Sequence, residues 1–122
     1  MQYAILCYDR EEIVEGWTQA EDDAVIAKHR AVEHDLAKKG RLGPTLRLLP
    51  THAAMTVRSG DQPLVLDGPF AETKEQLLGL WIIDADSHEE ALETAKKLAS
   101  HKKTGALEVR PLRYFAAQKQ VA

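Results

Sequence analysis

The segment LLGLWIIDAD, Leu77–Asp86, decides how the rest of the chain has to fold. Its first seven residues show no alternation of apolar and polar side chains, so the strand that it predicts is apolar on both faces. The two faces would carry Leu78, Leu80 and Ile82 on one side and Leu77, Trp81 and Ile83 on the other. Such a strand belongs in the centre of a sheet that is covered from both sides.

Two capping boxes mark where helices begin. Thr18 with Glu21, and Ser87 with Glu90, each place a hydroxyl three residues before a glutamate. The first helix should end near Lys39, since cationic residues and then Gly40 follow there. The predicted helices cover residues 19–39 and about 88–101. The predicted strands cover residues 2–8, 43–50, 53–58, 64–66, 77–84 and 106–112, and residues 9–17 form a connector.

This order predicts an α+β fold, namely a ferredoxin-like βαββαβ sandwich formed by a single domain over residues 1–115 with a C-terminal tail at 116–122. Two helices can cover only one face of the sheet. No residues remain to cover the second face of the central strand, so we expect a second copy of the chain to pack there, sheet to sheet. The sequence therefore predicts a homodimer, with cavities near the dimer interface.

Composition excludes several classes of partner. The 122 residues carry a net charge of −3, which predicts neither nucleic-acid binding nor attraction to an anionic membrane. The N-terminal residues lack the pattern of a signal peptide, and a cytoplasmic protein is the expectation. Cys7 is the single cysteine of the chain. His52, His88 and His101 are not spaced as metal ligands, so we expect no metal and no cofactor.

His29 is the first candidate functional residue. Val25, His29, Val32 and Leu36 share one stripe of the first predicted helix, which should face the core. A buried imidazole needs a hydrogen-bond partner, so His29 is either a structural histidine with such a partner or a general acid/base that faces a pocket.

The loop VLDGPFAETKEQ, Val65–Gln76, supplies further candidates. Gly68 precedes a proline and should be extended, and the Asp67 side chain should accept a backbone N–H within the loop. The loop is either a rigid corner anchored by Phe70 or a site. As a site, Asp67 would act as a base or orient another group, Phe70 would contact the ligand, and Thr73 and Lys74 would bind an anionic group of it.

Two arginines complete the set of candidate ligand-binding residues. Arg47 follows the first helix in a stretch, 40–50, that contains no carboxylate. Arg110 alternates with Leu107 and Val109, so it should lie on the sheet face opposite the helices. There it would line the dimer cavity or pair with charged residues of the partner.

The segments DGPFAETKEQLLGLWIIDADSHEEAL and GALEVRPL resemble the YCII-related family, and specifically its DGPF branch. The resemblance implies a ferredoxin-like fold that dimerises into an α+β barrel. It also implies an acid/base pair of a histidine on the first helix and an aspartate soon after it. His29 matches the histidine, but residues 40–50 contain no aspartate. Asp67 would therefore have to come close to His29 in the folded chain to complete the pair.

Two classes of function follow from the residues and the resemblance together. One is a dimeric module that binds a small molecule or a regulatory partner in a cavity near the DGPF loop. The resemblance implies an extracytoplasmic-function sigma factor as such a partner. The other is a lyase- or isomerase-like enzyme that uses His29 as general acid/base, because one branch of the family is similar to dehydrochlorinases.

Overall fold

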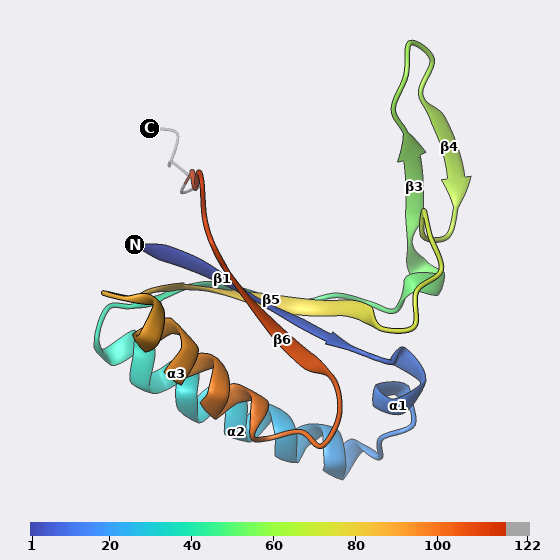
Figure 1. The fold of residues 1–122 in the computed structure, drawn as a ribbon. Coiled ribbons are helices and arrows are strands. Elements are labelled where there is room, and N and C mark those ends of the chain that lie inside the picture. Colours follow the sequence, from blue (N-terminus) through green and yellow to red (C-terminus); the bar gives the residue numbers. More distant parts are fainter. Residues whose placement is uncertain (117–122) are drawn as a thin grey trace, which may run out of the picture.

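The computed structural model describes residues 1–116, which form a four-stranded antiparallel sheet, a separate two-stranded hairpin and three α-helices (Figure 1). In chain order the elements are β1 (Gln2–Asp9), α1 (Glu11–Glu15), α2 (Gln19–Lys38), β2 (Leu42–Arg47), the 3-10 turn η1 (Thr51–Ala53), β3 (Met55–Arg58), β4 (Leu64–Asp67), β5 (Gln76–Asp84), α3 (His88–Ala99) and β6 (Ala106–Pro111). The strand order β2-β5-β1-β6 confirms the ferredoxin-like α+β prediction. Of the predicted tail at 116–122, only Ala116 falls within the described residues.

The sheet is built around β5 and its antiparallel neighbour β1. Ile5 lies opposite Trp81 and Tyr3 lies opposite Ile83, and all four side chains are buried beneath the helices. α2 and α3 both lie on this face of the sheet (Figure 1). Leu98 of α3 is fully enclosed between helix and sheet. The central position predicted for this strand is therefore confirmed.

Within residues 1–116, the opposite face of the sheet carries no helix (Figure 1). Ala4 pairs with Ile82 and Leu6 with Leu80 across this face, which we call the open face. Leu46, opposite Leu80 on the edge strand β2, is 45% exposed. The homodimer that would cover the open face stays a prediction.

The helix ends follow the predicted caps with one difference. At α2 the box is complete, since Glu21 N–H donates to Thr18 Oγ1 at 3.1 Å and Thr18 N–H donates to the Glu21 carboxylate at 3.0 Å. At α3 Glu90 N–H donates to Ser87 Oγ, but the Glu90 carboxylate accepts from the N–H of Asp86 instead of Ser87. The second box is therefore only half formed.

The predicted connector contains the short helix α1, so that assignment was wrong. The helix is held by contacts with residues far away in the sequence. Glu11 N–H donates to Gln76 Oε1 at 2.9 Å, and the Glu11 carboxylate accepts from the backbone N–H and the hydroxyl of Thr51 at 2.7 and 2.8 Å. β2 also differs, because it starts at Leu42 and accommodates Pro44 at a register shift on the sheet edge.

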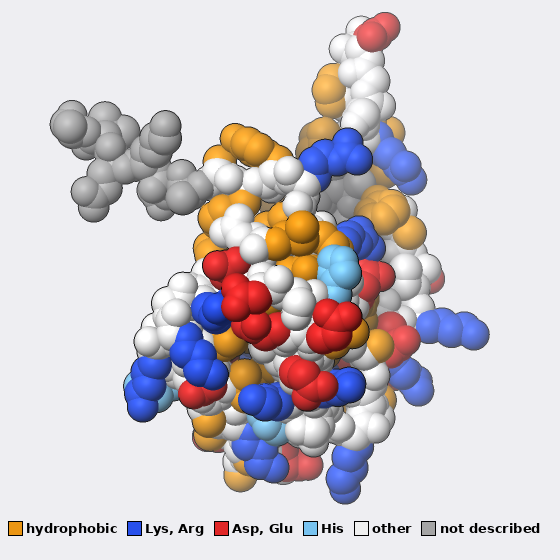
Figure 2. All heavy atoms as spheres, turned by 60° about the vertical axis from the view of Figure 1, so that its left-hand side comes forward, with side chains coloured by type: hydrophobic (Ala, Val, Ile, Leu, Met, Phe, Trp, Pro, Cys, Tyr) orange, Lys and Arg blue, Asp and Glu red, His pale blue; other side chains and the backbone are white. Residues whose placement is uncertain are grey.

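Strands β3 and β4 pair with each other and not with the main sheet. We call residues 54–68 the arm. It stands away from the sheet on the side opposite the helices (Figure 1). Figure 2 shows charged side chains gathered over the helical layer, while the projecting arm carries several hydrophobic side chains. Within residues 1–116, no helix is both long and apolar enough to cross a membrane.

Gly79 allows β2 and β5 to approach closely, so a substitution at Gly79 tests the packing of these two strands. A Cβ at Gly79 would collide with the carbonyl oxygen of Leu46 and lie 3.1 Å from Arg47 Cα. We expect Gly79→Ala to lower the free energy of unfolding by about 2–3 kcal/mol. The control is Gly40→Ala, where φ is +68° but nothing lies within 4 Å; it should cost only about 1 kcal/mol. Urea unfolding measures both, and equal losses would contradict the close approach.

Candidate functional site

A cleft of about 830 Å³ lies between α2, α1 and the β2–β5 side of the sheet. We call it the α2 cleft. Its walls combine apolar side chains, including both tryptophans of the chain, Trp17 and Trp81, with charged residues of α1, α2 and β2. Cys7, His29 and Lys102 also line it. The combination of apolar walls and a few buried polar groups is typical of small-molecule sites.

His29 lies on the α2 wall of this cleft and is 8% exposed. Its ring meets Trp81 edge-on at 5.2 Å between centroids, and His101 lies 5.4 Å away. Burial lowers the pKa of His29 to about 4, the positive potential of His101 acts in the same direction, and a hydrogen bond with the Leu98 backbone opposes them only in part. His29 is therefore a neutral imidazole at pH 7.

A buried ion pair lies beside His29. Lys102 Nζ is 2.8 Å from Asp9 Oδ2, and the two side chains are only 7% and 1% exposed. Asp9 also accepts the N–H of Arg10 at 2.8 Å and the hydroxyl of Thr104 at 2.9 Å. Burial raises the pKa of Asp9, but these hydrogen bonds outweigh it and hold the pKa below its ordinary value. Nζ also lies 5.6 Å from the centre of the Trp17 ring.

The sequence prediction missed both members of this pair. For Asp9 a signal existed, because the period of two in β1 places Asp9 on the same face as Tyr3, Ile5 and Cys7. Lys102 carried no comparable signal, since it lies in the turn after α3 and reaches Asp9 only through the fold.

Arg47 lines the α2 cleft as well, but its guanidinium already has a partner. It donates to both carboxylate oxygens of Asp22 on α2, at 2.6 and 3.2 Å. This hydrogen bonding lowers the pKa of the Asp22 carboxyl. The structure therefore brings two of the candidate residues, His29 and Arg47, to one cleft and places a strand-to-helix ion pair at its border.

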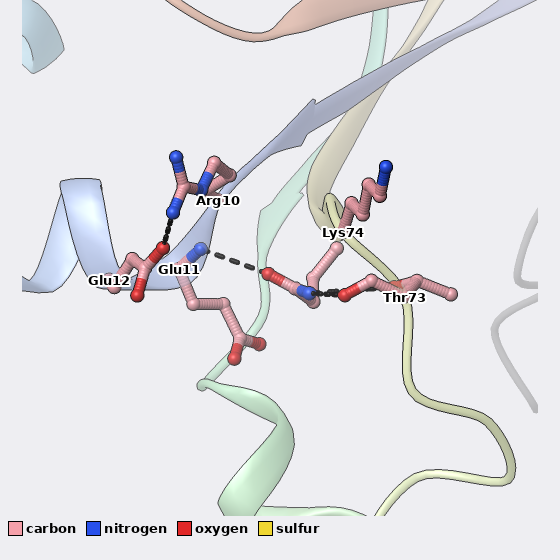
Figure 3. A pocket seen from close by; sticks show the side chains of 6 residues that line it. Arg10, Glu11, Glu12, Thr73 and Lys74 are labelled. Atoms are coloured by element: carbon pink, nitrogen blue, oxygen red, sulfur yellow. Dashed lines mark hydrogen bonds and ion pairs between the residues drawn. The ribbon is translucent and has the colours of Figure 1, made fainter.

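Thr73 and Lys74 border a different hollow of about 560 Å³, together with Arg10, Glu11 and Glu12 (Figure 3). The Thr73 hydroxyl donates to the Glu75 carbonyl at 2.7 Å. Arg10 pairs with Glu12, whereas the Lys74 amine points away from the other labelled side chains (Figure 3). The loop thus forms its own shallow surface and does not line the α2 cleft.

The remaining predicted residues lie apart from both hollows. Asp67 and Phe70 are exposed at the base of the arm and in the loop after it. Arg110 lies on the open face, where its partner in the described chain is Glu108. The structure therefore does not bring Asp67 to His29.

The predicted conformation of the loop corner was wrong in two respects. No hydrogen bond to the Asp67 side chain occurs among residues 1–116, and Gly68 has φ +86° instead of an extended conformation. Glycine reaches this left-handed region without strain, even before a proline. The corner is held by Gly68 N–H, which donates to the Ala54 carbonyl at 2.7 Å, and by the Thr56 hydroxyl, which donates to the Gly68 carbonyl at 2.7 Å.

No three His, Cys, Asp or Glu side chains gather as a ligand set for a metal ion within the part of the chain that the structure describes. The chemistry that the α2 cleft offers is that of a neutral imidazole, an ammonium group and apolar walls.

The low pKa of His29 predicts a specific loss of stability in acid. The unfolded chain binds a proton at His29 below pH 6.5, whereas the folded protein does so only near pH 4, so the free energy of unfolding falls as the pH falls through this window. We expect the wild type to lose about 2 kcal/mol more than His29→Gln between pH 7 and pH 5. The pKa of His101 is also lowered, but His101 is present in both proteins. Urea unfolding at the two pH values decides, and equal losses would refute a buried neutral His29.

Comparison with known proteins places the chain in a family. The family model described as the YCII-related domain matches residues 1–116. The chain is 47% identical over 117 residues to the uncharacterized protein R00369 of Rhizobium meliloti (strain 1021), and the match covers 94% of each chain. These matches confirm the family that the sequence motifs predicted, and the chain belongs to the YCII-related family.

Proposed function

We propose that the protein is a dimeric module that binds a small molecule in the α2 cleft. The observation that carries this proposal is a cleft of about 830 Å³ with apolar walls, in which His29 and Lys102 are more than nine-tenths buried. Burial of polar groups has a free-energy cost, and a ligand that hydrogen-bonds to them offsets it. This position differs from the predicted cavity near the DGPF loop.

The charges around the cleft favour an uncharged ligand. Lys102 and Arg47 are already paired with the carboxylates of Asp9 and Asp22, and Arg30, exposed on α2, is a third cation of the lining. Carboxylates outnumber these cations, since the lining includes Glu11, Glu15, Asp22, Asp23 and Glu33, so an added anion would meet a net negative charge. Lys102 Nζ has three donor hydrogens, and Asp9 is the one acceptor found for it within the described residues. A compact, largely apolar molecule that carries one oxygen acceptor fits this arrangement.

The open face supports the dimeric part of the proposal. One face of β1 and β5 is covered by helices. On the other face Leu6 and Leu80 are half-buried and Ile82 is 9% exposed, and within residues 1–116 no helix lies above them. A second copy packed sheet to sheet would cover these side chains. The DGPF branch and its link to an extracytoplasmic-function sigma factor stay predictions from the resemblance.

An enzyme remains the second candidate, because a neutral imidazole in a cleft can accept a proton. Two observations weigh against it. A pKa of about 4 makes His29 a weak base. In addition, the contacts of His29 within residues 1–116 include no carboxylate that would orient it, and Asp67 lies outside the α2 cleft.

Filling the cleft tests the binding proposal without breaking an ion pair. Val25 lines the cleft from α2, whereas Ala27 on the same helix is exposed and does not. We expect the neutral probe 4-fluorobenzamide to bind the wild type and Ala27→Trp alike, and to bind Val25→Trp at least tenfold more weakly. The measurement is a 19F NMR titration. Equal binding to all three proteins, or no binding to the wild type at millimolar probe, would contradict the proposal.

A further inference from the structure

The exposed hydrophobic side chains of the molecule are concentrated in and around the arm. Met55, Val57, Leu64, Val65 and Leu66 of its two strands are between 43% and 75% exposed. The charged residues of the arm are limited to Arg58, Asp61 and Asp67. Monomeric proteins rarely expose a contiguous apolar surface of this kind, and such a surface marks an interaction site.

Both faces of the arm carry exposed apolar side chains, although Thr56 and Arg58 share one face and Asp67 the other. The pairing of Val57 with Val65 places Met55, Val57 and Val65 on one face. The pairing of Thr56 with Leu66 places Leu64 and Leu66 on the other. A hairpin that only lay down on a surface would need one apolar face. A two-stranded hairpin is also marginally stable on its own in water, so this arm needs cover from both sides.

The length of the arm indicates where that cover lies. From Ala54 to the turn at Gly60 the arm rises about 20 Å at roughly 3.4 Å per residue. Two sheets packed face to face are only about 10 Å apart. Because the arm points away from the helices, on the side of the open face, it would extend past a sheet packed there (Figure 1). The arm therefore cannot end within the gap between two sheets.

We infer that the arm clasps a second copy of this chain, running along the edge of the sheet that packs on the open face. This inference rests on the proposed dimer and assigns its main contact to residues 54–68. The five apolar residues of each arm are between 43% and 75% exposed. If the partner covers them in both copies, they add to the area buried between the two open faces, toward the roughly 1,600 Å² of a standard stable interface. The arm and the open face lie on the same side of the molecule (Figure 1), and the exposed Leu46, Leu48 and Leu49 lie between them in the chain.

The base of the arm permits a clean deletion. Gly68 N–H already donates to the Ala54 carbonyl at 2.7 Å, so an Asn-Gly turn in place of residues 55–67 closes the chain without moving its ends. A matched pair of single substitutions accompanies it. Leu66 in the arm and Leu92 on α3 are 43% and 47% exposed, so serine at either position changes a similar apolar area.

Sedimentation equilibrium measures the outcome. We expect a wild-type dimer of twice 13.6 kDa at micromolar concentration. The dissociation constant should rise at least tenfold in Leu66→Ser, at least a hundredfold in the deletion, and less than twofold in Leu92→Ser. Far-UV circular dichroism should show that the deletion keeps its helices.

Two results would overturn the inference in distinguishable ways. A wild-type monomer at these concentrations would refute the proposed dimer, and with it the proposed contact of the arm. If the wild type is a dimer and the deletion leaves its dissociation constant unchanged, the dimer would stand, but the arm would not be part of its interface.

Discussion

Burial of β5 on both faces is the constraint on which the rest of the structure depends. On one face Trp81 and Ile83 are covered by α2 and α3, which gives the chain its core. On the other face no helix within residues 1–116 covers Leu80, which is half-buried, or Ile82, which is 9% exposed. Hydrophobic burial is the main favourable contribution to folding, so a central strand that is apolar on both sides favours a second layer. The open face follows from this asymmetry, and the arm projects on the same side of the molecule (Figure 1).

The polar groups under the helices determine what the cleft can do. A buried ion pair contributes little net stability, but removal of one partner leaves an uncompensated charge and costs about 3–5 kcal/mol. Asp9 and Lys102 are therefore fixed in place together with Thr104 and the N–H of Arg10. His29 beside them is kept neutral by the same burial. A ligand would meet a rigid set of donors and acceptors rather than mobile surface charges.

The sequence predicted those features that depend on local patterns. The apolar run of β5, the hydroxyl caps at Thr18 and Ser87 and the apolar stripe around His29 are each encoded within a few residues. Features made by distant residues were not predictable in this way. α1 is held through Thr51 and Gln76, and Asp9 is satisfied by Thr104, which lies 95 residues away. The separation of Asp67 from His29 was not predictable either, because it depends on a hairpin that does not pair with the main sheet.

Amide hydrogen exchange of the arm at different protein concentrations tests most directly whether the chain is completed by a second copy. An isolated hairpin opens readily, so its amides exchange quickly unless a partner covers it. If a second copy clasps the arm, amides of residues 55–58 and 64–67 should be protected at high concentration and lose protection on dilution, while those of β5 stay protected. Arm amides that exchange at the unprotected rate at every concentration would contradict the account.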